Sequence, residues 1–361
     1  MKKIVNLISL LLIISTNILQ GQTQTQSVEE LIKEGIELHD AGEYEEAIDR
    51  YNEALETDST HMLAVYEISL SYLALKDYDN AIMYSTQVIN SDNKQLSPGA
   101  YAVKSESLAE MKKVDEAIEL LKEGLEKNGD NSLLHFNLAL NYFNKGETDK
   151  TLEHVATAID IDKTHSGAFL LNAYTLRDKG MWVQSLLSFQ MFLLLEPDSK
   201  RSKNAFAEML QIMQLSEDKE PVERSFLQQK LSGSREKNDS TNIFPPLTTF
   251  NGLDRNIVFQ SITSTRDSLN IASEEVTDFT IFKTVNKEIM KILERESRNP
   301  NEGIIWTFYI PFFTYIANSN YYDTYCRYIS VSYYPESYEW WKNNTEAALN
   351  FITWFEKGQD S

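Results

Sequence analysis

A fourteen-residue stretch recurs along the first half of this chain at nearly constant intervals. Residues 42–55 read GEYEEAIDRYNEAL, and related stretches begin at residues 76, 112, 146 and 180, in steps of 34, 36, 34 and 34. The charged residues differ between copies, whereas the small and aromatic residues keep their places. Such a period predicts a stack of similar units, because a single unit of this size cannot bury its apolar face alone.

Two columns of small residues show what each unit is. The first column holds Ala47, Ala81, Ala117, Thr151 and Ser185. The second column precedes it and holds Gly35, Ser69, Ser105, Ala139 and Ala173. Aromatic and aliphatic residues stand three or four places from each column, which keeps them on one face of a helix. The pattern predicts two closely packed helices per unit, joined by turns that carry Gly42, Gly146 and Gly180.

This helix–turn–helix pattern resembles the tetratricopeptide repeat. The matching residues are Gly35, Gly42, Tyr44, Ala47, Tyr51 and Ala54 in the first copy and Gly180, Trp182, Phe189 and Pro197 in the fifth. The resemblance implies an all-α solenoid of five repeats. A capping helix over 200–215 and a small helical C-terminal domain are expected to follow. The repeats are expected at 28–61, 62–95, 98–131, 132–165 and 166–199.

In this family the first helix of each repeat lines a concave groove that binds peptides. The resemblance therefore implies a partner-binding groove lined by Ile36, Tyr66, Leu70, Phe136, Asn137, Leu140, Phe143 and Tyr174. Asn137 occupies a place where such repeats often carry an asparagine that hydrogen-bonds an extended peptide backbone. The alternative is that these residues pack against the next repeat or against the protein's own C-terminal part.

The residues at the groove positions also indicate what kind of partner is expected. Chaperone-docking members of the family hold a C-terminal carboxylate with Lys and Arg on this surface. The corresponding residues here are Ile32, Ile36, Tyr66, Ala102 and Glu106. That clamp is absent, so we expect a protein or peptide segment that is apolar or basic.

The acidic balance of the chain argues against two classes of partner. The net charge is −20, and residues 28–199 alone hold 32 acidic and 14 basic residues. Such a surface repels phosphate backbones and anionic lipid headgroups. We therefore expect no nucleic-acid partner.

The first residues predict export. Lys2 and Lys3 precede an apolar run over 4–19, and the small residue Gly21 follows. A basic start, a short apolar core and a small residue are typical of a secretory signal peptide, here 1–21. A retained anchor helix is the alternative, although a span needs about 20 apolar residues. We expect a periplasmic or extracellular protein of a bacterial envelope, with no membrane span after cleavage.

The second half of the chain has a different character. Residues 216–246 are polar with a Pro-Pro pair, which predicts a linker before an aromatic-rich helical domain at 247–361. Helices are expected over 273–297 with Ser273 as its cap, over 303–318 with a kink at Pro311, and over 320–334 and 345–357. This segment resembles the tails of some secreted bacterial tetratricopeptide proteins, which have no assigned activity.

Eighteen of the last 62 residues are aromatic, and two interpretations follow. The rings can fill the core of a small helical domain. They can also form a surface that stacks on a glycan or another ring-shaped ligand.

The sequence gives little support for catalysis. It contains no HExxH, GxSxG, GxxxxGK or GxGxxG motif and no pair of cysteines for zinc. The one cysteine, Cys326, is expected to pack as a small apolar residue. We therefore predict a non-catalytic exported scaffold for protein–protein interactions, without metal or cofactor. Glycan binding by 247–361, or an enzymatic activity assembled there from distant residues, remains the alternative.

Overall fold

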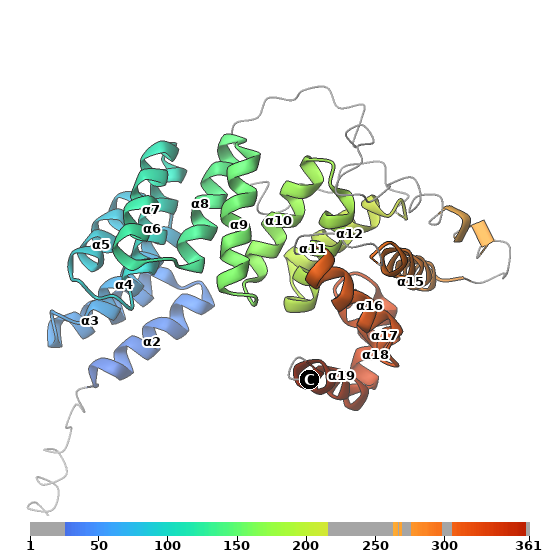
Figure 1. The fold of residues 1–361 in the computed structure, drawn as a ribbon. Coiled ribbons are helices and arrows are strands. Elements are labelled where there is room, and N and C mark those ends of the chain that lie inside the picture. The colour runs from blue at the N-terminus through green and yellow to red at the C-terminus, as the bar shows by residue number, and fades with distance from the viewer. Residues whose placement is uncertain (1–25, 216–262, 266, 269–275, 298–304, 359–361) are drawn as a thin grey trace, which may run out of the picture. The chain divides into compact units, whose positions relative to one another are not determined.

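The computed structural model describes residues 26–215, 263–265, 267–268, 276–297 and 305–358, and within these ranges it contains helices and no strands (Figure 1). The predicted all-α repeat array with further C-terminal helices is therefore confirmed. The predicted signal peptide 1–21 and linker 216–246 lie outside the described residues. The chain divides into two compact units, unit 1 (Met1–Lys113) and unit 2 (Val114–Ser361).

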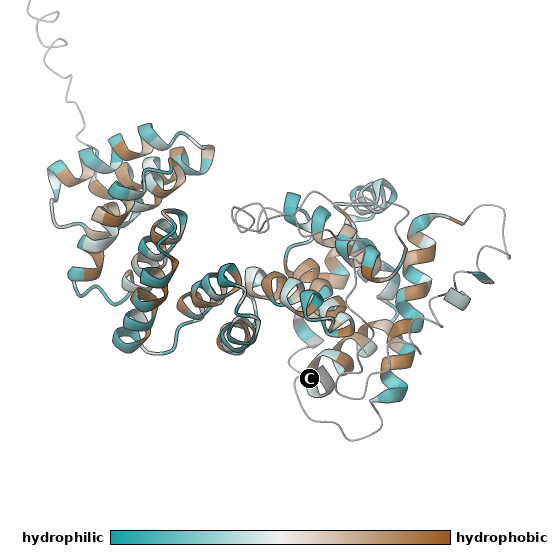
Figure 2. Ribbon diagram, turned by 90° about the horizontal axis from the view of Figure 1, so that it is seen from above, coloured by the Kyte–Doolittle hydropathy of each residue, from teal (hydrophilic) through white to brown (hydrophobic). Residues whose placement is uncertain are grey.

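Unit 1 contains the first two helix pairs and the first helix of the third. Its helices are α2 (Val28–Ala41), α3 (Tyr44–Thr57), α4 (Met62–Ala74), α5 (Tyr78–Asn90) and α6 (Ser97–Glu110). The array begins at a capping box, in which Ser27 accepts a hydrogen bond from the Glu30 amide and the Glu30 carboxylate accepts one from the Ser27 amide. Hydrophilic and hydrophobic bands alternate along these helices, as Figure 2 shows.

The sequence period reappears in the backbone. The turn inside each helix pair contains one residue with positive φ: Gly42 (86°), Lys76 (61°), Lys112 (66°), Gly146 (75°) and Gly180 (77°). The left-handed residue Gly42 ends α2, because the amides of Gly42 and Glu43 donate hydrogen bonds to carbonyls of the last helical turn. The same turn forms at Lys76 and Lys112 although a lysine side chain disfavours that conformation.

The core of unit 1 is built on the small-residue columns. Ala47, Tyr51, Ala54 and Ile68 are fully buried. Gly35 is essential here, because a Cβ at that position would collide with the Tyr51 ring. The stripe of buried residues occupies one face of α3, and the opposite face is acidic and exposed.

Unit 2 contains the remaining repeat helices and the C-terminal helices. The repeat and capping helices are α7 (Val114–Asn128), α8 (Ser132–Lys145), α9 (Thr148–Ile161), α10 (Ser166–Asp178), α11 (Trp182–Leu195) and α12 (Lys200–Ile212). The C-terminal helices are α15 (Asp278–Glu296), the π-helix η1 (Ile305–Tyr309), α16 (Ile310–Asn318), α17 (Tyr322–Ile329), α18 (Pro335–Asn343) and α19 (Thr345–Gly358).

Several C-terminal boundaries differ from the sequence-based expectation. The helix expected from Ser273 begins at Asp278 instead, because the Thr277 hydroxyl accepts the hydrogen bond from the Thr280 amide and serves as the cap. The helix expected to kink at Pro311 is a π-helix followed by α16, with the proline in the first turn of α16. The helix α18 was not expected, and it starts at Pro335, which suits a first helical turn.

One continuous core joins the last repeats to the C-terminal helices. Every residue of α11 from Trp182 to Leu194 is buried, on all sides of the helix. The same buried cluster includes residues of α12, α15, α16, α17 and α19. The Phe206 ring on α12 lies 4.9 Å from Phe282 and 5.4 Å from Tyr334. The placing of a domain boundary at 216–246 stays a prediction.

Candidate functional site

The groove residues expected in unit 1 lie on its first helices. The helices α2, α4 and α6 are the first of their pairs, and α4 contacts both of the others. We call the side of α2 and α4 that carries Ile36, Tyr66 and Leu70 the first-helix surface. Ile36 is 36% exposed, and Tyr66 and Leu70 are half-buried. These three residues are accessible to a ligand in unit 1.

Carboxylates stand beside these apolar side chains. Glu67 on α4 is half-buried, and Asp40 on α2 is exposed. Burial raises the pKa of Glu67, and the charge of Asp40 adds to that effect. The same burial, with the Glu67 charge, raises the pKa of Tyr66. The surface therefore combines an apolar strip with negative charge.

The groove residues expected in unit 2 are placed differently. The rings of Phe136 and His165 have their centroids 4.4 Å apart. Leu140 and Phe143 pack against the continuous core. Tyr174 is 1% exposed and lies edge-on to Phe189, with its ring below the Arg177 guanidinium. Tyr174 therefore belongs to the core of unit 2.

Asn137 is also largely enclosed. It is 8% exposed, and its side-chain amide donates to the Leu133 carbonyl one turn earlier in α8 at 2.8 Å. The backbone carbonyl of Asn137 accepts from the side-chain amide of Asn141 at 2.9 Å. The amide therefore stabilises the helix in this structure, and a contact to a peptide backbone stays a prediction.

C-terminal and capping helices cover the last repeat. Tyr309 of η1 meets Phe169 of α10 edge-on at 6.3 Å. Arg177 of α10 pairs with Glu208 of α12 at 2.5 Å. Two residues of α10, Phe169 and Arg177, therefore contact the protein's own η1 and α12.

A buried polar network fixes the C-terminal helices on α11. Gln190 is fully buried, donates to Asn286 of α15 at 3.0 Å and accepts from the Tyr325 hydroxyl of α17 at 2.7 Å. The Tyr322 hydroxyl donates to the Lys283 carbonyl at 2.8 Å. Because buried polar groups lose free energy when a partner is removed, this network favours one arrangement of the three helices.

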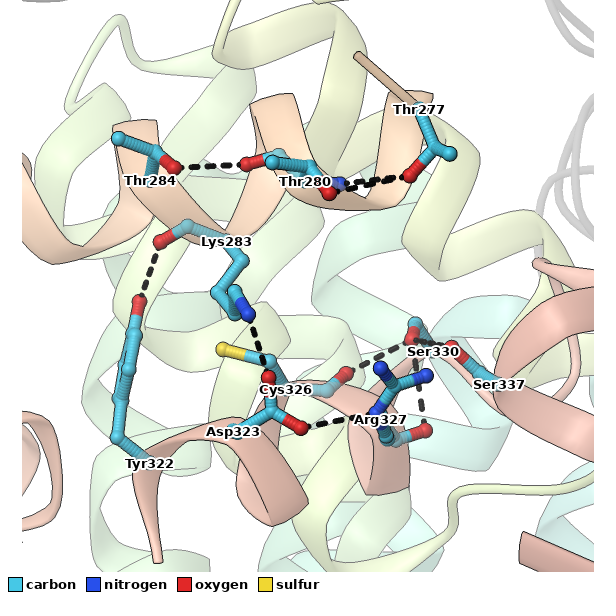
Figure 3. A network of polar contacts seen from close by, with 10 residues as sticks. All are labelled: Thr277, Thr280, Lys283, Thr284, Tyr322, Asp323, Cys326, Arg327, Ser330 and Ser337. Carbon is cyan, nitrogen blue, oxygen red and sulfur yellow. Dashed lines mark hydrogen bonds and ion pairs between the residues drawn. The ribbon is translucent and has the colours of Figure 1, made fainter. Parts of the chain in front are cut away.

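A charged cluster lies near this network, at the surface between α15 and α17. Figure 3 shows Lys283 and Arg327 both bound to Asp323. The N···O distances of these two ion pairs are 2.5 and 2.9 Å. Burial opposes ionisation of Asp323, but hydrogen bonds from the two cations outweigh it and lower its pKa. An ionised carboxylate that is paired with two cations is too weak a base for general base catalysis near neutral pH.

The pocket beside this cluster has mixed charge. It has a volume of about 340 Å³, and its two carboxylates, Glu288 and Asp323, are both paired with cations. It is lined by Lys283, Thr284, Lys287, Glu288, Ser319, Asn320, Tyr322 and Asp323. It therefore lacks a free acid–base pair.

Cys326 is fully buried, as expected from the sequence. Burial raises the pKa of its thiol to about 12. The thiol is therefore protonated at neutral pH and unsuited to act as a nucleophile.

Two histidines meet inside the fourth repeat. The Nδ1 atoms of His135 and His154 are 3.0 Å apart, and Asp130 lies 3.5 Å from Nε2 of His135. Burial, and then the neighbouring imidazole, lower the pKa of His154. Within the described ranges no group of three or more metal-binding side chains is found.

No described helix is long and apolar enough to cross a membrane. Sequence reasoning missed the carboxylates Glu67 and Asp40 beside the first-helix surface. A signal was present, since an acid stands at 67 where the other repeats carry Lys33, Val103, Asn137 and Leu171.

Comparison with known proteins agrees with the repeat pattern. Residues 32–88 match the family model described as tetratricopeptide repeat. The BBSome complex member BBS4 of Bos taurus is 24% identical over 150 residues, which are 42% of this chain and 28% of that protein's length. The chain thus spans little more than a quarter of that relative.

Two solved structures overlap with about half of the chain. A thermophilic tetratricopeptide protein of Thermus thermophilus is 18% identical, with 52% of this chain and all of that chain covered and a TM-score of 0.45. YrrB, described as a tetratricopeptide protein with an unusual peptide-binding site, is 21% identical, with 49% and 90% covered and a TM-score of 0.33. The chain therefore contains a match to the tetratricopeptide repeat at residues 32–88, within an all-helical, tetratricopeptide-like repeat array that is followed by additional C-terminal helices.

Proposed function

We propose that the protein is a non-catalytic scaffold that binds an extended peptide segment of a partner protein on the first-helix surface of unit 1. The observation that carries the proposal is the accessibility of Ile36, Tyr66 and Leu70 on neighbouring helices. Adjacent apolar side chains on a repeat array give a peptide both contact area and register.

The residues around this surface select the chemistry of the peptide. Glu67 and Asp40 add negative charge, and no Lys or Arg among the described residues pairs with either of them. An acidic peptide would be repelled, whereas an apolar or basic one would meet a complementary surface. Of the groove residues expected in unit 2, Asn137 and Tyr174 are buried. The other three, on α8, are half-buried like Tyr66 and Leu70, but they pack against the core of unit 2: Phe136, Leu140 and Phe143.

The proposal is tested with peptide pools and the full chain. A labelled heptapeptide pool carries norleucine at its centre and equal mixtures of Ala, Leu, Tyr, Ser and Asn elsewhere, and its binding is measured by fluorescence anisotropy. We expect Ile36→Glu and Leu70→Glu to weaken binding about tenfold, since each buries a charge under the peptide. The control Met83→Glu changes an equally apolar residue on α5 that is 46% exposed.

The outcomes distinguish a peptide-binding role of Ile36 and Leu70 from a purely structural role. Lost binding with an unchanged melting temperature supports a groove. Equal binding by wild type and both variants, or no binding by wild type, would exclude the first-helix surface as the site.

The proposal includes export. It is supported by the basic and apolar residues of 1–21, which precede the described part of the chain. N-terminal sequencing of the protein isolated from its native cells should begin just after Gly21. A chain that retains residues 1–21 would contradict cleavage.

A second candidate function rests on one exposed aromatic stack. Tyr315 of α16 is 54% exposed, and its ring lies 5.3 Å from Trp354 of α19 with an interplanar angle of 13°. The ring of Tyr321 also stacks on Trp354, at 4.9 Å. Such a stack suits a sugar ring. Retention of the full chain on polysaccharide beads, lost on Tyr315→Ala, would favour this function.

A further inference from the structure

The pocket between α15 and the turn that joins α16 to α17 contains a lysine without an anionic partner. Lys287 lines this pocket, and its ammonium lies 5.0 Å from the centroid of the Tyr322 ring. Among the described residues, the Lys287 side chain forms no ion pair and no hydrogen bond. A half-buried ammonium that lies over an aromatic ring keeps its N–H donors available to a ligand.

The ring beside this lysine is held in place by the buried network. The Tyr322 hydroxyl donates to the Lys283 carbonyl at 2.8 Å, as Figure 3 shows, and accepts from the Asn286 side-chain amide at 3.3 Å. Lys283 and Lys287 stand four residues apart, so they share one face of α15. Because the ring is fixed, ordering the lysine against it costs less when a ligand binds.

The charges around the pocket favour an anion. The two carboxylates that line it, Glu288 and Asp323, are both in ion pairs at 2.5 to 2.9 Å. Their partners are three cations, Lys283, Lys291 and Arg327. With Lys287, four cations therefore surround two carboxylates, in a chain whose net charge is −20. This local excess of positive charge attracts an anionic group, and Lys287 is available to bind it.

The rest of the pocket wall suits hydroxyl groups. Asn320 is exposed, and its side-chain amide has no hydrogen-bond partner in the described part of the chain. The Thr284 hydroxyl donates to the Thr280 carbonyl at 2.8 Å, so its oxygen can still accept a hydrogen bond. The volume of about 340 Å³ is near the lower end of the range of about 300–1,000 Å³ that ligand pockets span. The ligand is therefore small and polar.

We propose that this pocket binds a small carboxylate that carries hydroxyl groups, such as a sugar acid, with its carboxylate on Lys287 and a hydroxyl group on Asn320. An apolar ligand would remove water from these polar groups without replacing its hydrogen bonds. The site does not depend on peptide binding by unit 1. It is also separate from the aromatic stack, since none of the stacked rings lines the pocket: Tyr315, Tyr321 and Trp354.

The test measures binding of glucuronate to the full chain by isothermal titration calorimetry, with glucose and acetate as matched probes. Glucose lacks the carboxylate, and acetate lacks the hydroxyl groups. We expect glucuronate to bind about tenfold more tightly than either probe, because it alone engages both Lys287 and Asn320. Lys287→Gln should abolish the preference over glucose, and Asn320→Ala should weaken glucuronate binding about threefold. The control Lys203→Gln removes one exposed positive charge from α12 and should leave binding unchanged.

The outcomes separate this site from a general effect of charge. Equal binding of glucuronate and glucose, or no binding of either, would overturn the proposal, and equal binding of acetate would exclude a sugar acid. A preference that survives Lys287→Gln, or that falls as far in Lys203→Gln, would assign it to the overall charge of the protein and overturn the pocket. Because Asn320 is exposed, Asn320→Ala tests the site even if Lys287→Gln lowers the melting temperature. Unchanged glucuronate binding by Asn320→Ala would contradict the assignment.

Discussion

The same repeat position has different surroundings in the two units. Ile36 in the first repeat and Tyr174 in the fifth occupy equivalent places on their helices, yet Ile36 is 36% exposed and Tyr174 is 1% exposed. In unit 1 the second helices bury one stripe, as α3 does, whereas α11 in unit 2 is buried on all sides. The difference teaches that the availability of a groove position depends on what packs over the repeat, as well as on the repeat itself.

This comparison assigns different roles to the two regions. Unit 2 contains the large aromatic core, the buried polar network and the C-terminal helices. Unit 1 contains smaller clusters and a first-helix surface with unpaired acidic groups. We interpret unit 1 as the peptide-binding region and unit 2 as the more stable one.

The largest effect is expected from Phe206→Ala. This fully buried ring contacts Phe282 and Tyr334, so its loss leaves a cavity between α12 and the C-terminal helices. We expect the free energy of unfolding, measured by urea denaturation, to fall by about 3–5 kcal/mol. The control Ile36→Ala in unit 1 should change it by less than about 1 kcal/mol. Equal effects of the two changes would remove the distinction between the units.

A smaller loss is expected when the buried network is broken. Gln190→Ala would remove the hydrogen bonds that Gln190 makes to Asn286 Oδ1 and to the Tyr325 hydroxyl inside the core. We expect a loss of about 2 kcal/mol in the same urea measurement. A variant as stable as wild type would show that the network does not hold α15 and α17 on α11.

Glu67→Gln should act in the opposite direction and depend on pH. The pKa of Glu67 is raised above its ordinary value of 4.5, mainly by burial. The stability linked to its proton is therefore complete below pH 4.5 and is lost as the pH rises through the pKa in the folded state. The variant should melt at a higher temperature than wild type at pH 7, with no difference below pH 4.5. A variant that melts lower at pH 7 would contradict the unpaired state of Glu67.

The smallest effect is expected at a turn of unit 1. Lys76 has a φ of 61°, which glycine adopts without strain and which the equivalent Gly42 shows as well. Lys76→Gly should stabilise the protein by about 0.5–1 kcal/mol. Lys76→Ala, which keeps the Cβ, should bring no gain in the same thermal melts.

The local structure of the array was accessible from the sequence because its signals repeat. The columns at Ala47 and Gly35 predict two helices per unit, and the left-handed residue recurs with the same steps even where lysine replaces glycine. By contrast, the packing of the last repeat against the C-terminal helices joins segments far apart in the chain. The contacts of Gln190 span 96 and 135 residues, and no short pattern encodes them.

The residues of the candidate site could be predicted from the sequence only in part. The period places Ile36, Tyr66 and Leu70 on successive first helices, but it does not say which other segments of the chain pack over them.

Within the C-terminal region α18 was missed, because its tyrosine and tryptophan residues lack a helical stripe and Pro335 resembles a loop signal. The Thr277 cap competed with Ser273, and only the observed hydrogen bond to the Thr280 amide decides between them.

The most direct test of the account is amide hydrogen exchange of the full chain with and without a saturating amount of the norleucine pool. We expect slower exchange in α2 and α4 on binding, with α10 and α11 already protected and unchanged. Protection that appears only in unit 2, with α2 and α4 unaffected, would contradict unit 1 as the peptide-binding region.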